Sequence, residues 1–183
     1  MTISPGRRAS DSTGDPRVSS TVQSMTTPEL PMWAHPPAHA AYRRSEVSAV
    51  IGRGDAVWNR ATDEVLRWRV KTESGFTVDQ PRPVAEGDRV TVTARVLGVR
   101  VVEPVEVVRV VRMPDRVGFS YRTLPGHPVD GEEAFIVHRS GDDVHLTVRS
   151  LTRAARRQPW RMLYPLLRVA QAIAHRRYLR ALR

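Results

Sequence analysis

The chain of 183 residues contains no cysteine, so disulfide bonds and thiolate metal sites are excluded. No uncharged apolar run approaches the roughly 20 residues that a membrane-spanning helix needs. The first residues also lack the apolar segment of a signal peptide, so we expect a cytoplasmic protein. The length is typical of one domain with a tail or two, and it is enough to bury a sizeable core.

Lysine is almost absent, and acidic residues are absent from the C-terminal segment. Of the 29 basic residues, 28 are arginine and only Lys71 is lysine. This skew, together with abundant Ala, Val, Asp and Pro, is typical of a GC-rich genome. The net charge is +10, and residues 153–183 supply +9 of it because they hold nine arginines and no acid. The body of the chain is therefore close to neutral, and the C-terminal segment is its cationic element.

Hydrophobic periodicity is missing from the N-terminal part of the chain. Residues 1–41 are rich in Ser, Thr, Pro and Gly, which predicts a disordered leader that contributes nothing to folding. Met1, Met25 and Met32 are alternative start positions for translation. Residues 42–183 are predicted to form a single domain.

The rest of the sequence predicts an α+β domain. Residues 45–51 are predicted to be a short strand, and residues 55–68 an amphipathic helix. From Gly87 the period changes to two, and strands follow one another with tight turns, which predicts an antiparallel meander with one buried face. A long helix is predicted over residues 158–182. Its broad apolar stripe is made by Leu163, Leu166, Leu167, Ala170, Ile173, Ala174 and Tyr178.

This order of elements resembles the helix-grip fold of the START and birch-pollen-allergen superfamily. The resemblance implies an antiparallel sheet that curves around the long C-terminal helix, with an apolar cavity between them. The short helix after the first strand fits the same arrangement.

A second resemblance is more specific and covers about residues 42–183. It rests on a Gly-x-Gly before the first helix, a Leu-x-Trp at the end of that helix, a central block and a closing helix. In this chain they are Gly52-Arg-Gly54, Leu66-Arg-Trp68, Tyr121-x-Thr123-Leu-Pro-Gly-His-Pro128 with Gly131-Glu-Glu-x-Phe135, and Arg177-Tyr178-Leu-Arg180. These marks are similar to an uncharacterised family known only as a domain of unknown function. The resemblance supports the fold and the place of a site, and it implies no reaction.

The central block carries the candidate site. Alternation along a strand places Tyr121 and Thr123 on the core-facing side. On the next strand, the same alternation places Glu133 inward and Glu132 toward solvent. His127 lies in the loop between the two strands. A carboxylate in an apolar interior needs a partner, which for Glu133 would be His127, Tyr121 or an arginine of the terminal helix.

Three interpretations of this group stay open. It could be a structural network that pins the loop to the sheet, or the polar end of a ligand cavity that Trp68 also lines. It could also be an acid/base pair of His127 and Glu133. A nucleophilic triad has no support, because cysteine is absent and no serine lies in a nucleophile elbow. The six histidines do not form a metal-binding set, so neither a metal nor a cofactor is predicted.

The favoured function is non-enzymatic binding of a small, largely apolar molecule. One alternative is a cyclase-like or hydratase-like enzyme that uses His127 and Glu133. The other is an adaptor that binds an anionic membrane, or less favourably a nucleic acid, through the arginine-rich helix. An open cavity beside a buried Tyr121, His127 and Glu133 would favour binding or catalysis. A filled interior with an exposed basic face would favour the adaptor.

Overall fold

The computed structural model describes residues 23–34, 39–96, 99–155 and 158–183. In these residues the elements follow the predicted order of strand, helix, meander and terminal helix, with a short α2 and β2 in addition. Their bounds are β1 (Arg43–Arg53), α1 (Gly54–Val65), α2 (Arg69–Thr72), β2 (Phe76–Val78), β3 (Arg89–Val96), β4 (Val99–Met113), β5 (Arg116–Thr123), β6 (Val129–Ser140), β7 (Asp143–Ala154) and α3 (Trp160–Tyr178).

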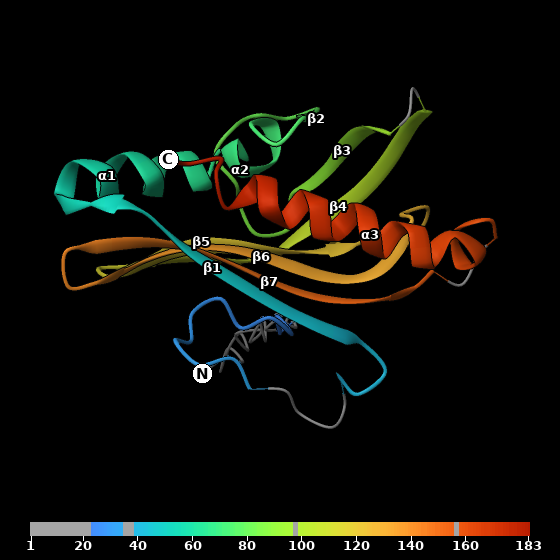
Figure 1. The fold of residues 1–183 in the computed structure, drawn as a ribbon, viewed down its shortest axis with the longest axis horizontal. Helices are drawn as coiled ribbons and strands as arrows, with labels where there is room; N and C mark the ends of the chain where they lie inside the picture. Colours follow the sequence, from blue (N-terminus) through green and yellow to red (C-terminus); the bar gives the residue numbers. More distant parts are fainter. Residues whose placement is uncertain (1–22, 35–38, 97–98, 156–157) are drawn as a thin grey trace, which may run out of the picture.

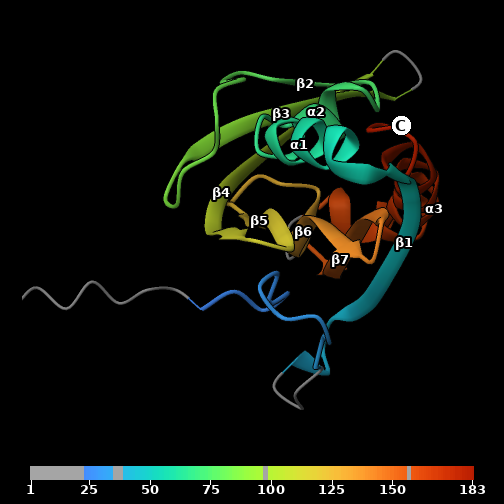
Figure 2. The same ribbon diagram turned by 90° about the vertical axis from the view of Figure 1, so that its left-hand side faces the viewer.

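All seven strands form one sheet in the order β1-β7-β6-β5-β4-β3-β2. From β2 to β7, strands that are consecutive in the chain are also neighbours in the sheet, and every pair is antiparallel. The exception is β1, which pairs with β7, so the first strand lies beside the last. The sheet curls from β1 through β7, β6 and β5 to β4 and β3, and α1 and α2 lie inside the curve (Figure 2).

The concave face of the sheet carries the main core. All three helices lie on this side of the sheet (Figure 1). The side chains of Val65, Phe119, Phe135 and Leu146 are fully buried there. An antiparallel sheet curved around a C-terminal helix is the helix-grip arrangement, so the predicted fold class is confirmed.

The predicted helix over residues 55–68 ends earlier than expected, because α1 stops at Val65 and the short helix α2 begins only at Arg69. Trp68 has a left-handed backbone, with φ of 64°, and it separates α1 from α2. This conformation costs a non-glycine residue about 1–2 kcal/mol. The turn directs the indole into the core, where its ring centroid lies 4.8 Å from that of Phe119 and 5.6 Å from that of Tyr121. Burial of the tryptophan offsets the cost of the backbone strain.

The convex face of the sheet is covered by residues 23–34, which lie below the sheet in Figure 1. Glu132, on β6, accepts hydrogen bonds from the hydroxyl groups of Ser24 and Thr26 and from the backbone N–H groups of Met25 and Thr26. On the neighbouring strand β7, the Arg149 guanidinium donates to the carbonyl oxygens of Thr26, Thr27, Leu30 and Pro31.

Two predictions are therefore wrong. Residues 23–34 are not part of a disordered leader, because Glu132 and Arg149 bind their backbone and Trp33 is buried with them. Residues 1–22 and 35–38 of that predicted leader lie outside the described residues. Glu132 points outward as alternation requires, but it is only 4% exposed because the segment covers it.

The terminal helix α3 packs less fully than predicted. Within the helix only His175 and Tyr178 are buried, and Leu182 is buried just beyond its end. Leu166 and Ile173, which were assigned to the core-facing stripe, are 62% and 49% exposed. The helix thus has apolar side chains on two faces, and only one of these faces packs against the sheet. No helix in the described ranges is long and apolar enough to cross a membrane.

Candidate functional site

The centre of the site is a pair of side chains on adjacent strands. Tyr121 on β5 lies opposite Glu133 on β6, and both face the concave side of the sheet. The Tyr121 hydroxyl donates a hydrogen bond to Glu133 Oε2. Glu133 is 9% exposed, so the expectation of an inward, largely buried carboxylate bonded to Tyr121 agrees with the structure.

A second partner of Glu133 is Lys71, the only lysine of the chain, on α2. Lys71 Nζ lies 3.1 Å from Glu133 Oε2 and donates to the Tyr178 hydroxyl at 2.8 Å. Lys71 is only 4% exposed. The ammonium lies 4.7–5.7 Å from the ring centroids of Phe76, Tyr178, Tyr121 and Phe135. Aromatic faces at this distance attract a cation, so the charge is held by one carboxylate and a ring of aromatic groups.

Two further titratable groups complete the cluster. His175 on α3 places Nε2 at 3.4 Å from Glu133 Oε1. Glu103 on β4 is half-buried and lies close enough to Lys71 and Glu133 for their charges to affect its pKa. We call Lys71, Glu103, Tyr121, Glu133, His175 and Tyr178 the interior cluster.

The opposite charges of Lys71 and Glu133 stabilise each other and offset the effect of burial on their pKa values. Burial alone would raise the pKa of Glu133, but Lys71, His175 and Tyr121 outweigh burial and hold that pKa well below its usual range. Burial would lower the pKa of Lys71, but Glu133 and the neighbouring oxygens outweigh it and raise that pKa. Lys71 is therefore an ammonium and Glu133 a carboxylate at neutral pH. Burial raises the pKa of Glu103, with Lys71 opposing it.

Lys71 and Tyr178 each keep one hydrogen-bond donor without an acceptor within the described residues. An ammonium has three donors, and Lys71 directs them to two oxygen acceptors, those of Tyr178 and Glu133. The Tyr178 hydroxyl accepts from Lys71, and its own proton has no acceptor in the described part of the chain. Burial raises the pKa of Tyr178, so this proton stays in place at neutral pH. The pair therefore offers donors to an oxygen acceptor.

The structure separates His127 from this cluster. His127 Nδ1 lies 2.9 Å from the carbonyl oxygen and 3.1 Å from the amide nitrogen of Val129, within its own loop. Burial, with the charge of Lys71, lowers the pKa of His127 to about 3. The proposed bond between His127 and Glu133 is absent among the described contacts. His127 is a neutral group that organises the loop.

Thr123 and Trp68 have supporting roles. The Thr123 hydroxyl accepts a hydrogen bond from the backbone N–H of Gly131 at 3.0 Å, which closes the β5–β6 loop. Trp68 is 1% exposed and packs on the ring of Tyr121. Of the five predicted site residues, Tyr121 and Glu133 belong to the cluster, Trp68 supports it, and Thr123 and His127 hold the loop beside it.

Sequence reasoning missed Lys71 and His175 as partners of Glu133, and Tyr178 as a partner of Lys71. The sequence did carry a signal for Lys71. In a chain with 28 arginines and one lysine, the general bias toward arginine does not explain the lysine at this position. His175 and Tyr178 are spaced three residues apart, so they share a helix face. Neither signal identifies a carboxylate partner on a distant strand.

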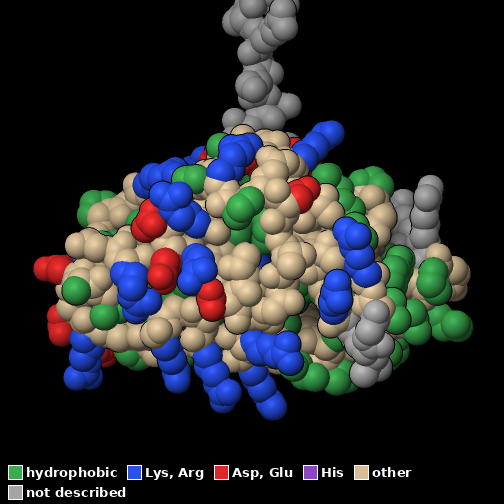
Figure 3. All heavy atoms as spheres, turned by 90° about the horizontal axis from the view of Figure 1, so that it is seen from above, with side chains coloured by type: hydrophobic (Ala, Val, Ile, Leu, Met, Phe, Trp, Pro, Cys, Tyr) green, Lys and Arg blue, Asp and Glu red, His purple; other side chains and the backbone are tan. Residues whose placement is uncertain are grey.

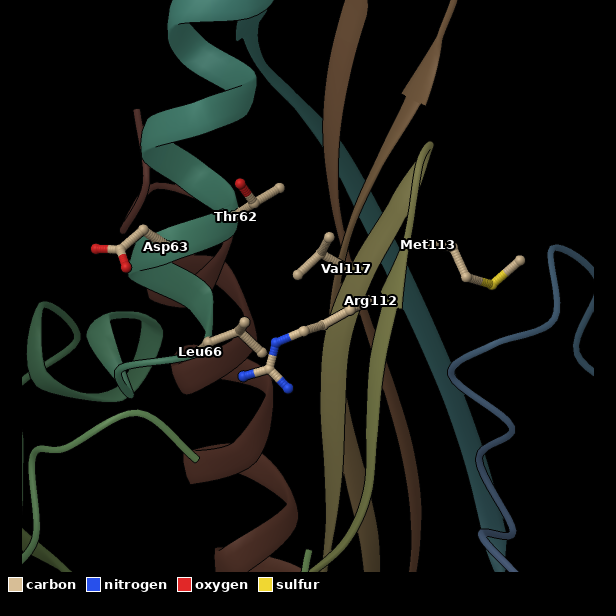
Figure 4. A pocket seen from close by; sticks show the side chains of 6 residues that line it. All are labelled: Thr62, Asp63, Leu66, Arg112, Met113 and Val117. Carbon is tan, nitrogen blue, oxygen red and sulfur yellow. The ribbon is translucent and has the colours of Figure 1, made fainter. Parts of the chain in front are cut away.

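The described surface has shallow hollows, and in two of them no predicted site residue contributes to the lining. The first, of about 360 Å³, lies between α1 and the β4–β5 hairpin and is lined by Thr62, Asp63, Leu66, Arg112, Met113 and Val117. Figure 4 shows Arg112 reaching toward Leu66, whereas Met113 points to the other side of the strands. The second is lined by Glu73, Arg177, Arg180, Ala181 and Arg183. In the described residues, no three His, Asp or Glu side chains are grouped so that they could hold a metal ion.

Comparison with known proteins assigns the chain to a family. The model of the domain of unknown function DUF1990 matches residues 23–181. The chain belongs to the DUF1990 family. The match begins within the segment that covers the convex face, so this DUF1990 domain extends further toward the N-terminus than the sequence analysis expected.

A curated relative and two of the similar solved structures are compared with this DUF1990 protein. A UPF0548 protein of Deinococcus radiodurans is 45% identical over 71 residues, which are 38% of this chain and only 35% of that relative. A hypothetical protein of Helicobacter pylori has a TM-score of 0.55 at 13% identity, covering 77% of this chain and 84% of that one. The Zhui aromatase/cyclase of a Streptomyces species has a TM-score of 0.51 at 17% identity, covering 77% of this chain and 91% of that one. At these identities the structures share the fold alone.

Proposed function

We propose that this DUF1990 domain binds a small, largely apolar molecule through an oxygen acceptor, such as a carbonyl or carboxylate, that Lys71 and Tyr178 receive. The observation that carries the proposal is the unused donors of these two groups in an otherwise aromatic surrounding. An acceptor oxygen would complete their hydrogen bonds, whereas an ammonium or a purely apolar ligand would leave them without a partner.

The interior cluster is closed in this structure, so ligand entry needs a movement. The packing of α3 makes that movement inexpensive, because within α3 only His175 and Tyr178 are buried. The rest of the helix is tied to β7 by two side-chain bonds, Tyr164 Oη to the Thr152 carbonyl and Gln171 Nε2 to Ser150 Oγ. Displacement of the N-terminal part of α3 from the sheet therefore breaks few contacts. Glu103, His127 and Thr123 are half-buried, so the cluster approaches solvent on the β4–β6 side.

The acid/base alternative has less support from the geometry. His127 and Glu133 make no hydrogen bond with each other, and each has another partner. A carboxylate whose pKa Lys71 holds well below its usual range is a weak general base at neutral pH. A filled interior with an exposed basic face would favour the adaptor alternative. This condition is met in part, because the interior is filled around Tyr121 and Glu133 and the arginine-rich helix is exposed.

Competition with a fluorescent probe tests the proposal. Anilinonaphthalene sulfonate is bound to the full chain and displaced with decanoate or with decylamine, which share a ten-carbon chain and differ in the polar group. We expect decanoate to bind at least about tenfold more tightly, a difference of about 1.4 kcal/mol. Stronger binding of decylamine would mean that the carboxylates receive the ligand, and it would contradict the proposal.

The control is Lys71→Met, which removes the charge and keeps a chain of similar length. In this variant we expect the preference for decanoate over decylamine to disappear. Circular dichroism and a thermal melt establish that the variant is folded. If Lys71→Met does not fold, Tyr178→Phe removes one of the two unused donors and keeps the ring, and it is expected to weaken decanoate binding by about three- to tenfold. An unchanged preference in both variants would overturn the assignment.

A further inference from the structure

One face of α3 is not used by the domain. Met162, Leu166, Val169 and Ile173 follow at intervals of four, three and four residues, which places them along one side of the helix. They are 74%, 62%, 58% and 49% exposed. His175 faces the core, and Ile173 lies about 200° around the helix from it. We call these four residues the outer stripe, and it faces away from the sheet.

Arginines surround the outer stripe and have no acidic partners. Arg161, Arg168, Arg176 and Arg177 on α3 are exposed. None of the four forms an ion pair within the described ranges. Many exposed arginines on other elements are paired, as in Arg53–Asp143 at 2.6 Å, Arg67–Asp63 at 3.0 Å and Arg82–Asp88 at 2.6 Å. Genome composition explains the number of arginines, but it does not explain why residues 153–183 contain no acidic residue.

The largest group of exposed apolar side chains on the face seen in Figure 3 lies at one end of the molecule. Figure 3 shows hydrophobic side chains concentrated at its right-hand end, the end at which α3 begins in Figure 1, with no acidic side chain among them. A contiguous apolar patch bordered by charge marks an interaction site more often than scattered surface residues do. Its partner must accept aliphatic side chains and carry negative charge.

We propose that the outer face of α3 docks on an anionic lipid bilayer and lies in the plane of its surface. The outer stripe enters the boundary between headgroups and acyl chains, while the arginines bind lipid phosphates. This occupant satisfies both features of the helix at once. A second copy of the chain fits less well, because an α3–α3 contact would bring two sets of unpaired arginines together. A nucleic acid would use the arginines but leave the aliphatic side chains in water.

Co-sedimentation of the full chain with vesicles tests the docking. We expect binding to vesicles that contain about a third phosphatidylglycerol and none to pure phosphatidylcholine. Raising the salt from about 0.1 M to about 0.5 M should weaken the binding, because charges at the surface are screened. Equal binding to both kinds of vesicle, or binding that salt does not affect, would overturn the assignment to an anionic surface.

Charge-matched variants separate α3 from the overall charge. Arg161→Gln, Arg168→Gln and Arg176→Gln together are expected to weaken vesicle binding by on the order of a hundredfold, from about 1 kcal/mol per arginine. Arg53→Gln, Arg60→Gln and Arg67→Gln remove the same charge from other elements, and their effect is expected to stay within about threefold. A similar loss in both sets would show that only net charge matters.

The aliphatic contribution has its own pair of variants. Leu166→Gln with Val169→Gln should reduce binding at least about tenfold, because the buried apolar area is lost. Val50→Gln with Met113→Gln, at two positions that are each 44% exposed, should leave binding unchanged. Sedimentation velocity tests the alternative of a dimer. If the protein is a dimer that Leu166→Gln with Val169→Gln dissociates, and if it does not bind vesicles, the outer stripe is a dimer interface and the membrane proposal is wrong.

The absence of cysteine permits a direct measurement of insertion. Leu166→Cys and Met113→Cys each give a single position for a polarity-sensitive fluorophore. We expect a blue shift on anionic vesicles for the label at position 166 and none for the label at position 113. Shifts at both positions, or at neither, would contradict docking through α3. This outcome does not depend on the ligand site, because residues 162–173 contribute nothing to the interior cluster.

Discussion

Lys71 and Glu133 form an ion pair in the interior of the domain, with Nζ and Oε2 3.1 Å apart and side chains that are 4% and 11% exposed. One residue comes from a single-turn helix and the other from a central strand. Each holds the other in its charged form, as the opposite shifts of their pKa values show. The pair also fixes where the unused donors of Lys71 and Tyr178 point.

The first prediction concerns the cost of breaking this pair. Lys71→Met and Glu133→Gln each leave a buried group without its partner, which costs about 3–5 kcal/mol when a buried ion pair is broken. Urea unfolding should therefore show a large loss for either single change. The double variant should lose less than the sum of the two, because neither charge is then left alone. Arg60→Ala, in an exposed pair on α1, should cost no more than about 1 kcal/mol.

The second prediction concerns the segment on the convex face. Glu132→Ala removes the acceptor of two hydroxyl groups and two backbone N–H groups, so it should cost about 2–3 kcal/mol. Hydrogen exchange should also become faster at Met25 and Thr26. Glu73→Ala, in an exposed pair with Arg69, serves as the control and should stay within about 0.5 kcal/mol. An equal effect of the two changes would mean that residues 23–34 contribute nothing to stability.

The third prediction is a dependence of stability on pH. His127 has a pKa of about 3 in the folded protein, against 6.5 for an ordinary histidine. Between these values the unfolded chain binds more protons than the folded one, so stability falls as the pH falls. His138, whose pKa burial and Arg116 lower to about 4, acts in the same direction.

From pH 6.5 to about 4.5, each of these two histidines should remove about 2 kcal/mol. His127→Asn should reduce the loss of stability over this pH range by about 2 kcal/mol, the contribution of one histidine. Glu133 contributes only below its ordinary value of 4.5, because its folded pKa is lowered. Urea midpoints measured across this window test the assignment. A slope that His127→Asn does not change would show that His127 is protonated in the folded state.

The fourth prediction distinguishes two glycines. Gly126 has a φ of +102°, and a Cβ built there would meet only Pro104 Cγ at 3.7 Å. Gly126→Ala should cost about 1–2 kcal/mol from backbone strain alone. At Gly118 a Cβ would lie 2.2 Å from the carbonyl oxygen of Phe135. Gly118→Ala should therefore be far more damaging, and thermal melts of the two variants compare them directly.

Strand alternation predicted the inward direction of Tyr121 and Glu133 correctly, because a period of two leaves no choice once Phe119 and Phe135 are in the core. The same rule placed Glu132 outward, but it could not predict a cover that comes from residues 23–34, which have no periodicity. Lys71 was missed because the left-handed backbone of Trp68 turns α2 inward, and no pattern in the helix indicates that turn. On α3 the apolar residues were assigned to a single face, whereas their spacing also fits two.

The measurement that tests the ligand site most directly is the NMR signal of the only lysine. Labelling with ¹⁵N-lysine gives one side-chain signal, that of Lys71 Nζ, without any need for assignment by mutation. We expect this signal to shift on titration with decanoate, to saturate at the concentration that displaces the fluorescent probe, and not to move with decylamine. If decanoate displaces the probe while the Lys71 signal stays in place, the ligand binds elsewhere and the interior cluster is a structural network.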